Sequence, residues 1–197
     1  MTAPTLISIS DVKALKININ EVLRYLKINK KSDDIIAYLD ECKELVYKNA
    51  NPRGAFIRTE ISVCEDIIDF GFDRVESKKL AKNLKGCKEA YAFVATLGVE
   101  IDRLFERYLK IEPSKASVCD AIASSLIESF CDYINEYLKA NETLCPRFSP
   151  GYGDYSIKHQ GALLNILDAS KRVGITLTNS YMMVPTKSVS AIIGIKI

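Results

Sequence analysis

A long helical pattern, from Pro113 to about Ala140, limits the folds that are open to this chain. Proline is tolerated in the first turn of a helix, so Pro113 can begin it. At about 100° per residue, the apolar side chains of the pattern form one broad arc on the helix surface. That arc contains Ile122, Leu126, Phe130, Tyr133, Ile134 and Tyr137. A helix with such an arc packs against another layer, which the rest of the chain must supply.

Patterns typical of β-strands occur on both sides of this helix. Residues 55–64 alternate and are rich in β-branched residues, and residues 89–97 form an apolar run that ends at Gly98. Three further strand patterns follow in residues 175–178, 181–184 and 188–195. Because short links join successive strands and no regular βαβ alternation is present, we predict an α+β domain with a mixed or antiparallel sheet flanked by helices.

Shorter elements account for most of the remaining chain. A strand over residues 14–19 is predicted to precede a helix that Asn20 caps. Ser32 and Ser77 stand at N-cap positions of two further predicted helices. Residues 157–173 are predicted to form one helix. Since no linker or repeat interrupts the chain, we expect a single domain over residues 1–197.

Composition excludes several classes of partner. Lys and Arg exceed Asp and Glu by only 27 to 25, so the charge does not favour nucleic acid as a partner. No apolar run reaches the roughly 18 to 20 residues that a membrane span needs. The N-terminus lacks the basic and apolar segments of a secretory signal. We therefore expect a cytoplasmic protein with no membrane partner.

The sequence also lacks common catalytic and metal-binding signatures. Its six cysteines include no C-x-x-C pair, and His159 is the only histidine, so we expect reduced cysteines and no metal site. Dinucleotide-binding, P-loop, G-x-S-x-G and H-E-x-x-H motifs are absent. No catalytic residue is therefore predicted, although an unrelated small-molecule enzyme that uses Asp154 and His159 stays possible at this point.

The stretch R-F-S-P-G-Y-G-D-Y, residues 147–155, combines turn-forming residues with polar side chains. Proline presets one backbone angle and the glycines permit conformations that other residues avoid, so a rigid loop is predicted. Such a loop is either a plain connection or a carrier of function. Glu128, on the long helix, lies outside the apolar arc beside Asp132 and small residues. Periodicity alone is consistent with a solvated carboxylate there.

Several separated motifs carry a family resemblance. The loop motif, L-D-A-S-K-R-V-G-I-T-L-T-N-S-Y-M-M-V-P and K-S-V-S-A resemble the C-terminal activation domain of cobalamin-dependent methionine synthase, especially its short stand-alone relatives. Two earlier motifs, A-F-V-A-T-L-G-V-E-I-D and D-A-I-A-S-S-L-I-E-S-F-C-D-Y, are similar to the same family in the same order. The resemblance covers residues 89–197, whereas residues 1–88 are only weakly matched.

The resemblance implies a bent, mainly antiparallel sheet and a site for S-adenosylmethionine. It implies an accessory, reactivating subunit that supports reductive remethylation of cob(II)alamin on a separate cobalamin-dependent methionine synthase or related corrinoid methyltransferase. Cobalamin would then be bound by the partner, and flavodoxin or another reductase would supply the electron. The chain is too short to be a complete methionine synthase. The alternative is a non-catalytic interaction or metabolite-sensing module that docks on a corrinoid protein.

The same resemblance implies five residues that bind the cofactor. Arg147 would hold the methionyl carboxylate of S-adenosylmethionine through its planar guanidinium, and Glu128 would accept from the ligand's ammonium group. Tyr152 would place its ring near the sulfonium, an attraction of roughly 0.5 to 2 kcal/mol. Pro150 and Gly151 belong to the loop whose backbone would approach the adenosine.

Overall fold

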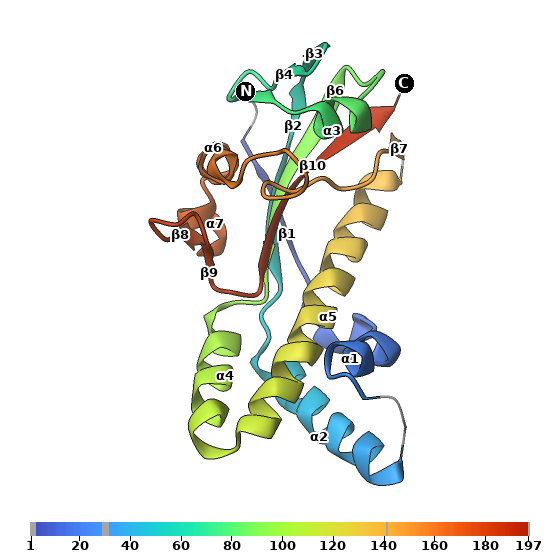
Figure 1. The fold of residues 1–197 in the computed structure, drawn as a ribbon, viewed down its shortest axis with the longest axis vertical. Helices are drawn as coiled ribbons and strands as arrows, with labels where there is room; N and C mark the ends of the chain where they lie inside the picture. Colours follow the sequence, from blue (N-terminus) through green and yellow to red (C-terminus); the bar gives the residue numbers. More distant parts are fainter. Residues whose placement is uncertain (1–2, 29–31, 141, 197) are drawn as a thin grey trace.

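Five antiparallel strands form the main sheet of the computed structural model, which describes residues 3–28, 32–140 and 142–196 (Figure 1). Their order across the sheet is β1-β2-β6-β10-β7. The strands are β1 (Thr5–Ser8), β2 (Arg53–Glu60), β6 (Glu89–Thr96), β7 (Thr143–Leu144) and β10 (Ser188–Lys196). The two edge strands are short, so the sheet depends on the three long strands at its centre.

The centre of the sheet is buried on both faces. β6 pairs with β10 over eight residues, from Ser188 opposite Thr96 to Ile195 opposite Glu89. Both strands are almost continuous runs of buried apolar residues rather than alternating ones. A strand with this pattern needs cover on each face, and two separate hydrophobic clusters provide it.

Four helices cover one face of the sheet at the lower end of the molecule (Figure 1). They are α1 (Ile19–Tyr25), α2 (Asp33–Asn49), α4 (Val99–Ile111) and α5 (Pro113–Lys139). The long helix α5 packs on the other three and continues upward along the sheet to β7. Its apolar arc fills this core, with Ile122, Leu126, Phe130 and Ile134 buried.

Shorter elements cover the opposite face and the upper end (Figure 1). The helices among them are α3 (Lys78–Asn83), α6 (Gln160–Ile166) and α7 (Ala169–Val173), and the 3-10 turn η2 (Ile157–His159) leads into α6. The other 3-10 turn, η1 (Val12–Ala14), precedes α1. Two small sheets complete the fold: β3 (Ser62–Cys64), β4 (Ile67–Asp69) and β5 (Arg74–Glu76), and β8 (Thr176–Leu177) with β9 (Met183–Val184).

The predicted fold class is confirmed. The predicted long helix, the strand at residues 89–97 and the helices capped by Ser32 and Ser77 are also present, as α5, β6, α2 and α3. α5 ends at Lys139 with Ala140 as its C-cap. Ser32 and Ser77 cap α2 and α3, where their hydroxyls accept from backbone N–H groups in the first turn. Within the described residues, no helix is long and apolar enough to cross a membrane.

Four predictions of local structure are wrong. Residues 14–19 form no strand, because Asn18 caps α1 with its side chain and donates its backbone N–H to Ser125 Oγ of α5 at 3.0 Å. Asn20 is therefore not the cap but lies in the first turn of α1, where its backbone N–H donates to the Asn18 side chain. Residues 157–173 are not one helix, because Asp168 takes a left-handed conformation (φ 46°) between α6 and α7. Residues 55–64 are not one strand, because the chain leaves the main sheet after Glu60 and β3 pairs with β4.

The cysteines are free thiols, as expected, but they differ in exposure. Cys64 is exposed, and the buried cysteines are Cys42, Cys87, Cys119, Cys131 and Cys145. Cys87 and Cys145 approach each other with sulfur atoms 3.6 Å apart, which is a contact rather than a covalent bond. They therefore act as small core residues.

Gly54 allows β2 and α5 to approach each other, and this generates a prediction about stability. A Cβ at this position would lie 2.9 Å from Val94 O and 3.1 Å from Ile134 Cδ1. We expect Gly54→Ala to lower the free energy of unfolding by about 1–3 kcal/mol through overpacking, measured by urea denaturation. The control is Gly161→Ala in α6, where the added Cβ meets only Leu177 Cδ1 at 4.0 Å. Equal effects of the two substitutions would contradict the prediction.

Candidate functional site

The segment after α5 lies along the free edge of β10, and this places Arg147. The backbone N–H of Cys145 donates to Gly194 O at 2.8 Å, and Phe148 forms a bridge with Ile192 through two hydrogen bonds of 2.9 Å. The side chain of Phe148 enters the core on the α6 face. Its neighbour Arg147 reaches the other way, to α5. The sheet edge therefore positions a guanidinium beside the long helix.

Arg147 contacts two carboxylates of α5. Its Nη2 lies 3.0 Å from Glu128 Oε2 and 3.0 Å from Asp132 Oδ1. The Arg147 side chain is 21% exposed, against 47% for Glu128 and 70% for Asp132. Glu128 and Asp132 are one helical turn apart, so both face the same way. The predicted pair, Glu128 and Arg147, is thus brought together.

A buried thiol lies close to the ion pairs of Arg147. Cys131 lies between the two carboxylates in sequence and is buried. Burial raises the pKa of its thiol to about 12, although Arg147 acts in the opposite direction. The thiol therefore stays neutral at physiological pH and is no nucleophile.

The turn that follows Arg147 is rigid, as its composition predicts. Gly151 and Gly153 adopt left-handed conformations, with φ of 90° and 63°. The N–H of Gly151 donates to Tyr155 O at 2.7 Å, which closes the loop on itself. A Cβ on Gly151 would meet Ile157 Cδ1 at 3.1 Å. Glycine is therefore required both by backbone conformation and by the packing beneath it.

Asp154 fastens this loop to the rest of the molecule. Its carboxylate accepts from the Ser77 hydroxyl and from the backbone N–H of Lys78 at 3.0 Å, at the start of α3. The hydrogen bond from Ser77 is the main cause that lowers the pKa of Asp154, and backbone donors add to it. Asp154 therefore joins the loop to the start of α3.

The aromatic residues of the loop divide into buried and exposed ones. Tyr155 is buried, and burial raises the pKa of its phenol. Tyr152 is 67% exposed and rests with its ring edge on Phe148, at 5.3 Å between centroids. His159 places Nδ1 2.9 Å from Asp73 Oδ2 and lies beside the Tyr155 ring. The histidine thus supports the buried side of the loop, whereas Tyr152 is available to a ligand.

Of the five predicted residues, Arg147 and Glu128 are in contact, and the other three follow Arg147 in the same loop. Arg147, Pro150, Gly151 and Tyr152 are on the loop at the edge of β10, and Glu128 is on the adjoining helix. Pro150 is buried, so its contribution is limited to the shape of the loop. Sequence reasoning placed Asp132 on the face of Glu128 but assigned it no role. Asp132 lies four residues after Glu128, and this spacing was the signal in the sequence that both carboxylates could contact the same partner.

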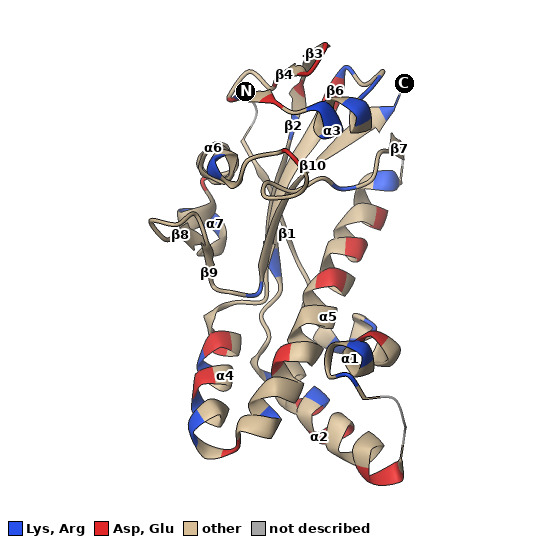
Figure 2. Cartoon of the chain, in the orientation of Figure 1, with Lys and Arg blue, Asp and Glu red and all other residues tan. Residues whose placement is uncertain are grey.

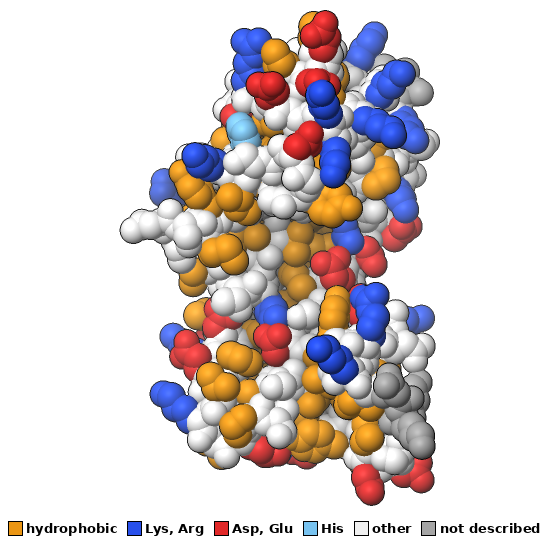
Figure 3. Space-filling model, in the orientation of Figure 1, with side chains coloured by type: hydrophobic (Ala, Val, Ile, Leu, Met, Phe, Trp, Pro, Cys, Tyr) orange, Lys and Arg blue, Asp and Glu red, His pale blue; other side chains and the backbone are white. Residues whose placement is uncertain are grey.

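The face of the molecule that carries α5 is hollowed at its middle. Figure 3 shows hydrophobic side chains in this hollow, with charged side chains at its rim. Acidic residues follow one another on the upper half of α5 (Figure 2). An apolar base with charged groups at its edge suits a ligand that has both kinds of surface.

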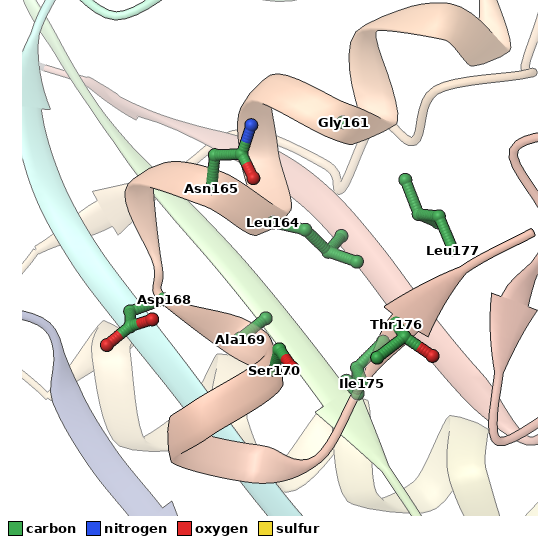
Figure 4. A pocket seen from close by; sticks show the side chains of 9 residues that line it. All are labelled: Gly161, Leu164, Asn165, Asp168, Ala169, Ser170, Ile175, Thr176 and Leu177. Carbon is green, nitrogen blue, oxygen red and sulfur yellow. The ribbon is translucent and has the colours of Figure 1, made fainter.

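A separate hollow of about 270 Å³ lies between α6, α7 and β8 (Figure 4). Leu164, Ile175 and Leu177 give it aliphatic walls, and Asp168 and Asn165 lie at its border. None of the five predicted site residues lines it. Asp168 Oδ1 lies 3.9 Å from Lys171 Nζ, so the carboxylate at this border already has a charged partner.

The side chains at the edge of β10 fit an amino-acid group better than a metal ion. The Arg147 guanidinium complements a carboxylate, and Glu128 complements an ammonium group. Arg147 Nη1 is buried and has no hydrogen-bond partner among the described residues. Within residues 3–28, 32–140 and 142–196, no cluster of three or more His, Cys, Asp or Glu could hold a metal ion.

Two comparisons with known proteins agree with each other. A family model described as "Vitamin B12 dependent methionine synthase, activation domain" matches residues 5–196. The fold is similar to a solved structure described as "Crystal Structure of the MetH Reactivation Domain bound to AdoHcy", with a TM-score of 0.75 and 18% identity. That alignment covers 98% of this chain and 78% of the other. A search of curated sequences found no match. The family match also includes the N-terminal part that motifs identified only weakly.

The role of Asp154 as an anchor predicts a pH-dependent contribution to stability. A carboxylate whose pKa is lowered in the folded state stabilises the protein at neutral pH and loses this effect as the pH falls through the lowered value. We expect Asp154→Ala to destabilise the protein at pH 7 and to have a smaller effect below about pH 4, measured by urea unfolding at both values. Glu100→Gln, an exposed carboxylate on α4, is the control. A loss of equal size at both pH values would refute this role.

Proposed function

Since the chain belongs to the family of the activation domain of vitamin B12-dependent methionine synthase, we propose that it binds S-adenosylmethionine at the edge of β10. The observation that carries the proposal is the contact between Arg147 and Glu128, at 3.0 Å. These residues come from different elements and supply opposite charges to one place. They match the two charged ends of the ligand's amino-acid group.

Each part of the ligand has a complementary group in this proposal. Arg147 binds the carboxylate and Glu128 accepts from the ammonium. The exposed ring of Tyr152 lies against the sulfonium, where a cation–π contact contributes about 0.5–2 kcal/mol. The left-handed Gly151, with no side chain, lets the adenosine approach the loop backbone. The hydrophobic base of the hollow receives the apolar face of the adenine.

We propose further that the bound ligand reactivates a partner. S-adenosylmethionine supplies a methyl group and an external reductase supplies one electron, so that cob(II)alamin becomes methylcobalamin and S-adenosylhomocysteine is released. The cobalamin is held by a separate cobalamin-dependent methionine synthase or related corrinoid methyltransferase. This chain contributes binding and orientation, which bring the methyl donor to the corrinoid.

Calorimetric titration with S-adenosylmethionine tests the binding site. We expect saturable binding to the wild type and an affinity about ten- to hundredfold lower for Arg147→Ala, because hydrogen bonds to charged groups contribute about 1.5–3 kcal/mol. The control is Arg103→Ala, which removes an exposed arginine that pairs with Glu100 on α4. Circular dichroism checks that both variants are folded. No binding by the wild type, or undiminished binding by Arg147→Ala, would exclude the proposed site.

A spectroscopic assay tests the reactivation step. The chain is mixed with a corrinoid methyltransferase in the cob(II)alamin state, reduced flavodoxin and S-adenosylmethionine, and the visible spectrum is followed. We expect the cob(II)alamin absorbance to fall only when the chain, the reductant and S-adenosylmethionine are all present. Binding of the corrinoid protein without any spectral change would instead favour a non-catalytic interaction or sensing module.

A further inference from the structure

The ion pairs of Arg147 are unequal, although their distances are the same. Glu128 and Asp132 both approach Nη2 at 3.0 Å, but only Glu128 has the geometry of a hydrogen bond. Among the described residues, Asp132 makes no other hydrogen bond or ion pair. Its side chain is also the more exposed, at 70% against 47% for Glu128. Asp132 is therefore the carboxylate that leaves Arg147 more easily.

The guanidinium is closed to a ligand carboxylate in this arrangement. A carboxylate binds arginine best through two parallel N–H donors. Nη2 already contacts two carboxylates, and Nη1 is buried without a partner. A ligand can therefore reach the terminal nitrogens only if a side chain on this face moves. The short, exposed side chain of Asp132 can turn into solvent by rotation about its own bonds.

We propose that Asp132 is an internal competitor for Arg147, displaced when the carboxylate of a ligand binds. This inference rests on the proposed function and adds a residue that sets the affinity of the same site. Asp132 occupies the position that the ligand carboxylate needs, whereas Glu128 stays and accepts from the ligand's ammonium. The two carboxylates that contact Nη2 of Arg147 thus have opposite effects on the affinity for the ligand: Asp132 lowers it and Glu128 raises it.

Substitution of Asp132 separates this role from a structural one. Asp132→Asn keeps the shape and removes the charge that competes for Arg147. We expect S-adenosylhomocysteine, which has the carboxylate but no sulfonium charge, to bind Asp132→Asn about two- to fivefold more tightly than the wild type, the size expected from losing a surface ion pair. Glu128→Gln should instead bind it more weakly, because the acceptor of the ammonium is lost.

A ligand without a carboxylate provides the decisive comparison. Decarboxylated S-adenosylmethionine cannot use Arg147, so its affinity should not rise in Asp132→Asn. The matched control variant is Glu136→Gln, which removes a carboxylate of the same exposure, 70%, from the same helix, where it pairs with Lys139. This control should leave both affinities unchanged. Calorimetric titration of all four proteins measures these differences.

The outcomes separate this inference from the proposed function. If Asp132→Asn binds S-adenosylhomocysteine more tightly than the wild type does, and binds decarboxylated S-adenosylmethionine no more tightly, the result supports both the inference and the proposed function. If wild type and Asp132→Asn bind it equally, or if Asp132→Asn binds it more weakly, Asp132 is no competitor and the proposed function stands. If Asp132→Asn tightens both ligands, the effect does not pass through the carboxylate and the inference fails. If no variant binds either S-adenosylhomocysteine or S-adenosylmethionine, the proposed function fails, and the inference with it.

Discussion

The burial of β6 and β10 on both faces is the constraint from which the rest of the structure follows. Their backbones pair with each other over eight residues, and most of their side chains on both faces are apolar and buried. Each face therefore needs its own cover, because exposed apolar surface costs about 25 cal/mol per Å². α5 with its neighbours supplies one cover, and α3, α6 and α7 supply the other. The chain must cross between these covers after α5.

That crossing creates the candidate site. The segment from Cys145 to Phe148 satisfies backbone groups along the edge of β10, so alternate side chains turn to opposite faces of the sheet. Phe148 enters one core, and Arg147 meets the acidic face of α5 on the other side. The turn that follows is held by Asp154 at the start of α3. A charged site on a loop is thus supported by the sheet and by two helices.

Elements with local signals were predictable, and those that depend on distant partners were not. The caps of α2 and α3 involve residues within one turn of each other, so the serines revealed them. The alternation in residues 14–19 was misleading, because Asn18 contacts Ser125, far along the chain, and becomes a helix cap. Asp168 ended the predicted helix of residues 157–173 through a backbone conformation that helical periodicity does not reveal. Short strands such as β1 and β7 have little pattern of their own.

The sequence by itself determined the long helix, the strand at Glu89–Thr96, the rigid turn with its glycines and the family to which the chain belongs. These properties arise from periodicity, from backbone preferences and from motifs, all of which are local. Only the tertiary structure decided that Arg147 meets Glu128, and that Asp132 shares the same nitrogen. The physical reason is that the contact depends on how the segment after α5 pairs with β10, a strand that forms more than forty residues later in the chain. Helical spacing showed which residues share a face, and the sheet edge determined what that face meets.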